Sequence, residues 1–226
     1  MNSRTGHFEP IAREGLSFVG ISAILALTAW WSNHPWLSLF FLVLAAAIAS
    51  FFRNPARRPP DDDAKVVSPA DGVVMEIMNN AEGPVLGKTG LTRVSIFMSI
   101  FNVHVNRWPF SGVVRKISHR PGKFLDARDP SSSILNENNS LVVDTAFGPI
   151  EVVQIAGKIA RRIVWWVREG DVAEKGDRFG LIRFGSRVDV YLPDHFIACA
   201  SVGSKVKAGV TVIARLAAQS DSHTGN

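Results

Sequence analysis

The sequence has little of what several functional classes require. It holds a single cysteine, Cys199, in 226 residues, which excludes an intramolecular disulfide framework and favours a reducing compartment. No spacing of His, Cys, Asp and Glu is typical of a metal site, so we expect no metal. The chain after its first quarter also lacks a basic block with interleaved aromatics, which argues against nucleic acid as a partner.

Charge is absent from two long apolar runs, residues 16–31 and 36–52. Each is slightly shorter than the ~20 residues that span a bilayer core. Residues 32–35 between them form a polar turn with a proline, flanked by tryptophans that suit a membrane interface. We predict a membrane-anchoring helical hairpin over residues 1–53, which either spans the bilayer or dips into it. A helical pair buried in a soluble core and a secretory signal are the alternatives.

Basic residues lie on both outer sides of these apolar runs. Arg4 and Arg13 precede them, and Arg53, Arg57 and Arg58 follow them. The positive-inside rule therefore predicts that both ends of the hairpin lie at the cytoplasmic face of the cell membrane. A formal net charge of +5 and a sequence pI near 9.7 suit a surface that meets anionic membrane lipid.

The remainder of the chain has the composition of a β protein. Residues 54–64 are expected to be a linker, and residues 65–226 are expected to form one catalytic β-domain. Short β-like runs broken by glycine occur at residues 72–77, 91–97, 140–145 and 188–192. This pattern predicts a mainly β fold, an antiparallel β-sandwich or flattened barrel.

Two segments, residues 68–74 and 202–214, resemble the hairpins of lipoyl and biotinyl carrier domains, and residues 167–177 have the same rhythm of valine, glycine and charged residues. We therefore expect lipoyl-like hairpin elements in the β-domain. A membrane-anchored adaptor module of this hairpin-barrel type, without catalysis, is an alternative function. The absence of a lysine in a Met-Lys-Met type turn argues against a carrier.

The pair Gly185-Ser186 offers a serine that can become a cofactor. A serine hydroxyl can attack the preceding glycine carbonyl and exchange the amide for an ester if the backbone is strained and a base takes the proton. Elimination then gives dehydroalanine, and hydrolysis leaves a pyruvoyl group at the new N-terminus. The dipeptide alone also fits a glycine bulge between two strands. A second pair, Gly203-Ser204, lies at an expected hairpin tip, where nothing predicts backbone strain.

The residues around the first pair, Arg-Phe-Gly-Ser-Arg-Val-Asp-Val at 183–190, resemble the cleavage region of the short form of the phosphatidylserine decarboxylase proenzymes. The resemblance continues, in order, at residues 51–55, 68–72, 102–107 and 203–206. Phe184 and Arg187 stand where long members of the family have leucine and threonine.

The resemblance implies a pyruvoyl-dependent carboxy-lyase. It would convert phosphatidylserine to phosphatidylethanolamine through a Schiff base with a covalent pyruvoyl group, made autocatalytically from Ser186. Cleavage between Gly185 and Ser186 would give a β chain of residues 1–185 and an α chain of residues 186–226, which remain together as a heterodimer. A pyruvoyl decarboxylase of another amine substrate is an alternative, and the state of any higher oligomer stays open.

Two further residues are candidates for proton transfer. His104 lies in an apolar segment, and its reference pKa of ~6.5 suits a proton carrier. Asp71 lies in Ser-Pro-Ala-Asp-Gly, where local sequence also fits a turn, and the matching aspartate of the family belongs to the processing machinery. Asp71, His104 and Ser186 would then work as a hydrolase triad does.

The chain departs from the family pattern near His104. Long members have His-x-x-His, whereas this chain has His104 and then Arg107 at the second position. This leaves open whether His104 serves processing, decarboxylation or both. His119 is a tentative substrate-cleft residue, because an equivalent segment lines the cleft in relatives.

Overall fold

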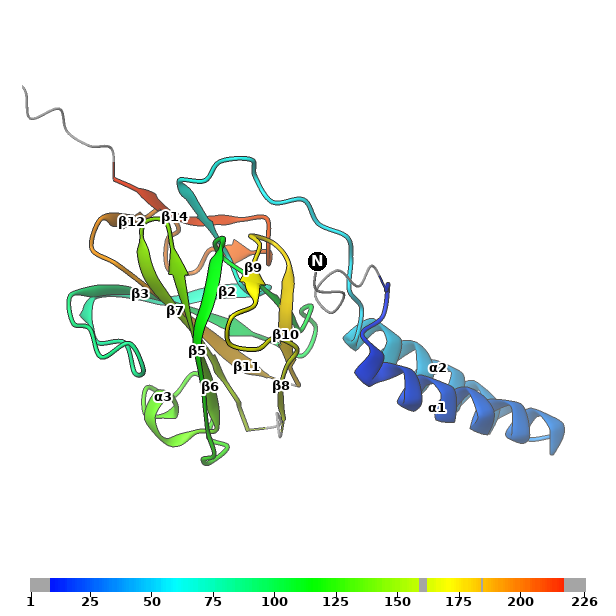
Figure 1. The fold of residues 1–226 in the computed structure, drawn as a ribbon. Helices are drawn as coiled ribbons and strands as arrows, with labels where there is room; N and C mark the ends of the chain where they lie inside the picture. The colour runs from blue at the N-terminus through cyan, green and yellow to red at the C-terminus, as the bar shows by residue number, and fades with distance from the viewer. Residues whose placement is uncertain (1–8, 159–161, 184, 218–226) are drawn as a thin grey trace, which may run out of the picture.

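The molecule consists of a helical hairpin joined by a linker to a β-domain (Figure 1). The structure, a computed structural model, describes residues 9–158, 162–183 and 185–217. Helices α1 (Arg13–Trp31) and α2 (Pro35–Phe51) lie side by side. Asn33, with a φ of 63°, lies in the turn between them, and Pro35 begins α2. Proline is favoured there because the first helical turn needs no backbone N–H donor.

The hairpin buries small residues and exposes large ones. Its buried positions include Ser22, Ala26 and Ala29, whereas Leu27 is 69% exposed and Trp31 is 93% exposed. A helical pair of a soluble core would bury its large apolar side chains, whereas small residues between helices are typical of membrane packing. By length and composition α1 can cross a membrane, and α2 is a shorter apolar helix of 17 residues.

The β-domain begins at Lys65 and contains the strands and one short helix. In chain order they are β1 (Lys65–Val67), β2 (Gly72–Ala81), β3 (Leu91–Met98), β4 (Val105–Arg107), β5 (Gly112–Arg120), α3 (Ser132–Leu135), β6 (Asn138–Thr145), β7 (Gly148–Ile155), β8 (Ile163–Trp165), β9 (Val172–Ala173), β10 (Arg178–Ile182), β11 (Ser186–Leu192), β12 (Phe196–Ala198), β13 (Lys205–Val206) and β14 (Val212–Leu216).

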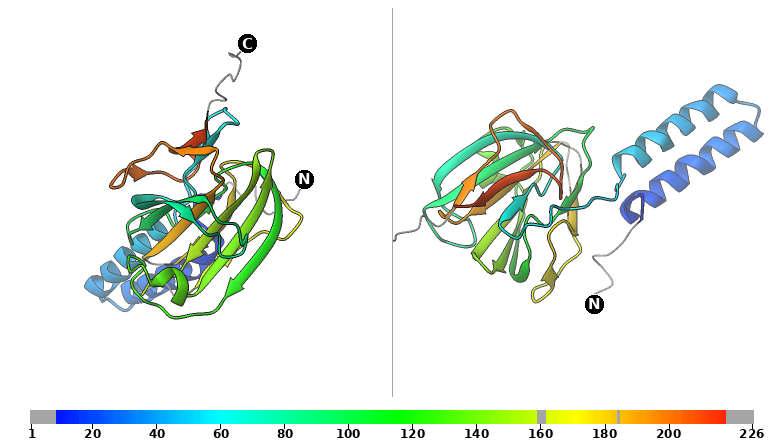
Figure 2. Two further views of the ribbon diagram at one scale, coloured as in Figure 1. Left: turned by 90° about the vertical axis from the view of Figure 1, so that its left-hand side faces the viewer. Right: turned by 90° about the horizontal axis from the view of Figure 1, so that it is seen from above.

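Eight of these strands form one curled sheet in the order β13-β2-β3-β11-β7-β6-β5-β9 (Figures 1 and 2). The strand pairs in this sheet are antiparallel. Two three-stranded sheets, β1-β14-β12 and β4-β10-β8, accompany it. The expected mainly β, antiparallel fold is confirmed, and the four β-like runs of the sequence lie in β2, β3, β6 and β11.

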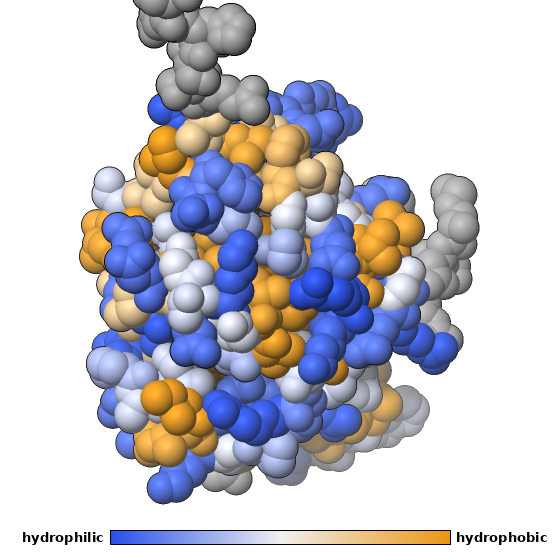
Figure 3. Space-filling view, turned by 60° about the vertical axis from the view of Figure 1, so that its left-hand side comes forward, coloured by the Kyte–Doolittle hydropathy of each residue, from blue (hydrophilic) through white to orange (hydrophobic). Residues whose placement is uncertain are grey.

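Alternation along the strands builds the core. Apolar side chains from the first to the last strands of the β-domain fill the interior. They include Val74, Ile96, Val152, Val188 and Ile213. On the outside, the face drawn in Figure 3 carries hydrophobic residues in separate spots among hydrophilic ones. This face of the β-domain thus has the surface of a protein in water, in contrast to the hairpin.

A second apolar cluster joins the hairpin to the β-domain. Phe51 and Phe52 at the end of α2 pack with Val103 and Val105 from the region of β4 and with Leu181 of β10. The backbone adds hydrogen bonds within the hairpin base, because the N–H of Ala12 donates to the carbonyl oxygen of Phe52 at 2.8 Å. The base of the hairpin is therefore packed directly against the segment that carries His104.

Candidate active site

Ser186 is the first residue of β11, and its side chain is fully buried. β11 lies between β3 and β7, and Ser186 is paired with Met98 of β3. Seven residues of β11 pair with β3, and five pair with β7. Ser186 itself pairs with β3, and the pairing with β7 begins at the next residue, Arg187. Phe184, two residues earlier, lies outside the described residues.

Gly185 adopts a left-handed backbone conformation, with a φ of +52°. A side chain would be strained at this φ, so the turn into β11 favours glycine. The carbonyl oxygen of Gly185, the group that Ser186 would attack, packs against Gly157. A Cβ atom at Gly157 would lie 1.9 Å from that oxygen. Glycine at 157 therefore makes room for the carbonyl, and the sequence alone did not single it out.

The hydroxyl of Ser186 has a sulfur atom as its hydrogen-bond partner. Ser186 Oγ donates to Met98 Sδ at 3.5 Å. The amide of Asn106 donates to the same sulfur at 3.7 Å. Both contacts are buried, and sulfur is a weak acceptor. The hydroxyl is therefore oriented without being tightly bound.

A buried chain of amides extends from this sulfur. Gln154 Nε2 donates to Asn106 Oδ1 at 2.8 Å, and Asn139 Nδ2 donates to Gln154 Oε1 at 3.1 Å. All three side chains are fully buried. Buried polar groups need partners, so the chain fixes the orientation of the Asn106 amide at Met98. No local motif identifies these three amides, because they come from three different strands and meet only in the folded β-domain.

His104 is buried at the joint between the hairpin and the β-domain. Its ring lies 4.0 Å from the ring of Phe51, measured between centroids. Neither ring nitrogen has a well-formed hydrogen bond to a residue that the structure describes. An imidazole with free nitrogens in an apolar site can exchange a proton with a reacting group.

Burial lowers the pKa of His104 to about 4. The charge of Arg53 acts in the same direction, whereas the backbone of Asn102 and the charge of Asp71 oppose the shift. His104 is consequently neutral near pH 7, which is the form that accepts a proton.

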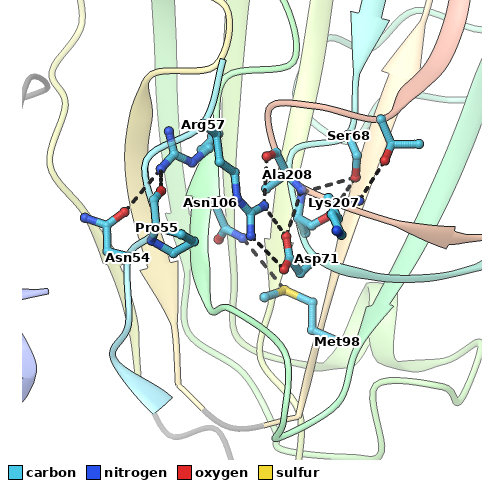
Figure 4. A network of polar contacts seen from close by, with 12 residues as sticks. Asn54, Pro55, Arg57, Ser68, Asp71, Met98, Asn106, Lys207 and Ala208 are labelled. Atoms are coloured by element: carbon cyan, nitrogen blue, oxygen red, sulfur yellow. Dashed lines mark hydrogen bonds and ion pairs between the residues drawn. The ribbon is translucent and has the colours of Figure 1, made fainter. Parts of the chain in front are cut away.

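Asp71 is held by partners other than His104. Its carboxylate forms a bidentate ion pair with Arg57, in which Nη2 donates to Oδ2 at 2.9 Å and Nη1 donates to Oδ1 (Figure 4). The backbone N–H of Ala208 also donates to Oδ1, at 2.8 Å. Asp71 acts on His104 through its charge rather than through a hydrogen bond between the two side chains.

Arg57 comes from the linker, where the sequence analysis interpreted it only as a positive charge beside the membrane. Its guanidinium also donates to the carbonyl oxygen of Ala208 at 2.8 Å. Arg57 therefore ties the linker to Asp71 and to the segment that precedes β14. No local motif identifies this residue, because its partner is distant in the sequence.

Arg107, at the second histidine position of long family members, also faces the linker. Its Nη1 donates to the carbonyl oxygen of Gly176 at 2.8 Å, and its Nη2 donates to that of Pro55 at 2.8 Å. Burial lowers its pKa to about 10. These contacts secure the linker against the β-domain, a structural role.

His119 and the second Gly-Ser pair lie in other surroundings. His119 Nε2 is 3.2 Å from Glu137 Oε1, and its ring stacks on Trp165. Trp165 lines a cavity of about 510 Å³ beside the start of α1. Gly203 and Ser204 form a turn on β2, in which the N–H of Gly203 donates to the Val74 carbonyl at 2.8 Å. Neither His119 nor this turn makes a described contact with Ser186.

No group of three or more His, Cys, Asp and Glu side chains that could hold a metal occurs in residues 9–158, 162–183 and 185–217. The structure thus brings Met98, Asn106 and Gly157 to the Gly185-Ser186 pair, whereas His104 and Asp71 have separate sets of partners. The predicted set of Asp71, His104 and Ser186 is not joined by direct hydrogen bonds between these side chains.

Known proteins resemble the chain over nearly its whole length. The family profile described as phosphatidylserine decarboxylase matches residues 44–214. A phosphatidylserine decarboxylase proenzyme of Geotalea uraniireducens is 49% identical over 209 residues, which cover 90% of this chain and 95% of the relative. Those of Pelobacter propionicus and Syntrophus aciditrophicus are 47% and 46% identical, over 92% and 90% of this chain and 97% and 96% of theirs.

These matches include the hairpin base, the linker and all the residues around Ser186. The β-domain is therefore that of an enzyme, a decarboxylase, rather than that of an adaptor module. More particularly, the chain belongs to the phosphatidylserine decarboxylase family.

Proposed function

We propose that the protein decarboxylates phosphatidylserine to phosphatidylethanolamine, with a pyruvoyl group that the chain makes from Ser186. The observation that carries the proposal is the buried Ser186 after a left-handed Gly185, in a chain of this family. The names of the relatives, which include the word proenzyme, support both the substrate and the processing.

Processing needs a hydroxyl, an accessible carbonyl and a base. Ser186 Oγ forms a bond to the carbonyl carbon of Gly185 while the C–N bond between the residues breaks, and the hydroxyl proton passes to the released nitrogen. The weak Met98 acceptor leaves the hydroxyl available for this attack. His104 is our candidate for the proton carrier, because it is neutral and buried and neither ring nitrogen has a well-formed hydrogen bond to a described residue.

The surroundings of Ser186 fit a pyruvoyl group at that position. The residue begins a strand, is enclosed by the sheet, and among the described residues has the Met98 sulfur as the one hydrogen-bond partner of its side chain. A ketone there would condense with an amine and accept the electrons that loss of carbon dioxide releases. His104 and Asp71 are the residues that we propose to manage protons around it.

After cleavage, the α chain of residues 186–226 would stay in the sheet as part of a heterodimer. β11 pairs with β3 and β7, and β14 pairs with β1. The Ala208 N–H to Asp71 hydrogen bond also joins the two chains. The hairpin would anchor this unit at the cytoplasmic face of the membrane, where a diacyl substrate is found.

The test is the intact mass of the purified protein, with and without a carbonyl-reactive amine. We expect two chains divided between Gly185 and Ser186, with only the smaller one gaining the mass of the reagent. A single chain of 24.7 kDa without reaction would refute the processing. Assays on phosphatidylserine vesicles and on soluble amino acids then distinguish the lipid from another amine substrate.

A further inference from the structure

The connection between β3 and β4 exposes two apolar side chains beside the candidate active site. Phe101 is 80% exposed and Ile100 is 44% exposed. The residues on either side, Ser99 and Asn102, carry no charge. Two adjacent exposed apolar side chains are a candidate contact surface where they lie next to a larger apolar surface.

The connection is held in shape by its own polar residues. Asn102 Oδ1 accepts hydrogen bonds from the backbone N–H and from the hydroxyl of Ser99, both at 2.8 Å. The N–H of Asn102 donates to the Ser99 carbonyl at 3.1 Å. The next residue, Val103, is buried in the cluster at the hairpin base. Ile100 and Phe101 are therefore presented outward by a fixed turn.

This turn lies at the base of the helical hairpin. Arg53 Nη2 donates to the carbonyl oxygen of Phe101 at 2.7 Å, and Arg53 Nη1 donates to that of Ser50 in α2 at 2.7 Å. One guanidinium thus joins the last turn of α2 to the exposed connection. Arginine at the end of an apolar helix is typical of the level of the lipid head groups.

We propose that Ile100 and Phe101 enter the interfacial region of the bilayer and form a second membrane contact, beside the hairpin. The partner is a lipid surface, chosen because the exposed pair continues the apolar surface of the hairpin across Arg53. The inference rests on the membrane anchoring that forms part of the proposed function.

The contact has a consequence for the enzyme. Met98, the partner of Ser186, is two residues before Ile100, and His104 is three residues after Phe101. Insertion of the turn therefore places the segments that carry both candidate site residues next to the membrane surface. The hairpin base is packed against the β-domain through Phe51 and Phe52, so a second contact on the same side fixes which face of the β-domain meets the membrane.

A single-cysteine scan tests the contact, because the chain has only one native cysteine to replace. In a Cys199→Ser background, Phe101→Cys is labelled with an environment-sensitive fluorophore, and the full chain is reconstituted in vesicles of phosphatidylcholine and phosphatidylglycerol. We expect a blue-shifted emission that is quenched by lipids carrying a spin label near the top of the acyl chain.

Two matched positions separate the possible outcomes. Ile134 is 71% exposed in α3, on the side of the β-domain away from the hairpin (Figure 1). A label on Ile134→Cys should therefore not be quenched. Leu27→Cys is 69% exposed in α1 and should be quenched. Quenching at Leu27 without quenching at Phe101 overturns the second contact and leaves the anchoring intact. Absence of quenching at both Leu27 and Phe101 would contradict the membrane anchoring, and the proposed second contact with it.

An activity measurement gives an independent readout. Phe101→Asp should lower the rate on phosphatidylserine in vesicles about tenfold, because a buried aromatic contact with lipid is replaced by a charge. The rate on a short-chain, water-soluble phosphatidylserine should stay within twofold of the parent. Ile134→Asp is the control, with both rates unchanged. An equal loss on the two substrates would show a structural role for Phe101 and overturn the proposal.

Discussion

The chain contains the dipeptide Gly-Ser twice, at 185–186 and at 203–204, in two different environments. Both glycines have a positive φ, +52° at Gly185 and +88° at Gly203, and neither has an atom near the position of an added Cβ. Backbone conformation therefore does not distinguish them. Ser186 is enclosed in the central strand β11, whereas Ser204 lies in a turn at the edge of the sheet.

The two pairs differ in their neighbours rather than in their backbone conformation. The Gly185 carbonyl is confined by Gly157, and the Ser186 hydroxyl faces the Met98 sulfur. The second pair instead begins the segment whose Ala208 N–H supports Asp71. We interpret the first pair as the reacting group and the second as part of the framework around it.

The largest effect that the comparison predicts is on cleavage itself. Ser186→Ala removes the nucleophile and should leave a single chain of 24.7 kDa with no carbonyl reactivity. Ser204→Ala is the matched control and should be cleaved as completely as the parent. Denaturing electrophoresis and intact mass measure both. Cleavage of the Ser186→Ala chain would show that another residue is the nucleophile.

A smaller effect is expected from the glycine that confines the carbonyl. In Gly157→Ala the new Cβ would meet the Gly185 oxygen at 1.9 Å, so the carbonyl must move away from its position before Ser186. Misplacement of a reacting atom by about 1 Å can cost about a hundredfold in rate. We expect a loss of this size in the cleavage rate, followed over time after cell-free synthesis.

Gly203→Ala is the control for this substitution. It introduces backbone strain at a φ of +88° without a close contact, so it should lower the stability by about 1–2 kcal/mol and leave the cleavage rate nearly unchanged. If Gly157→Ala and Gly203→Ala are cleaved at the same rate, the contact between Gly157 and the Gly185 carbonyl is not what distinguishes the two Gly-Ser pairs.

The third prediction concerns the ion pair between Arg57 and Asp71. Both side chains are largely buried, so Arg57→Gln leaves the carboxylate without its charged partner and should lower the free energy of unfolding by about 3 kcal/mol. Arg58→Gln, at an exposed position, should change it by less than about 0.5 kcal/mol. Chemical unfolding in detergent, in the uncleaved Ser186→Ala background, measures both.

A double variant identifies the cause. Adding Asp71→Asn to Arg57→Gln removes the unpaired charge and should recover part of the lost stability. A double variant whose loss equals the sum of the two single losses would show that the pair contributes no coupling energy.

The fold and the Gly185-Ser186 pair can be predicted from the sequence, whereas the residues that surround this pair cannot. The four β-like runs are found in β2, β3, β6 and β11 because alternation and glycine breaks are local signals. The apolar runs give α1 and α2 for the same reason.

The contacts around Ser186 depend on strand register instead. Met98 faces Ser186 only because β3 and β11 pair in one register, and Gly157 approaches Gly185 only in the folded sheet. Arg57 meets Asp71 across a linker that has no regular structure at its centre. Long-range pairing of this kind leaves no periodic signal in one sequence, so the predicted triad lacked these partners.

The smallest effect concerns His104, whose backbone carbonyl accepts a hydrogen bond at 3.3 Å from the N–H of Ile182, at the end of the strand before Gly185. Its pKa is about 4 in the folded state and ~6.5 when unfolded, so the unfolded chain takes up a proton first as the pH falls. The stabilisation from the neutral ring is complete above pH ~6.5 and is lost progressively down to about pH 4. Between about pH 7 and about pH 5 this amounts to about 2 kcal/mol.

In the uncleaved Ser186→Ala background, His104→Leu should therefore lose about 2 kcal/mol less stability than its parent over this interval, measured by chemical unfolding. The same pH dependence in both proteins would mean that His104 is solvated in the native state, and the argument for it as a neutral proton acceptor would then fail.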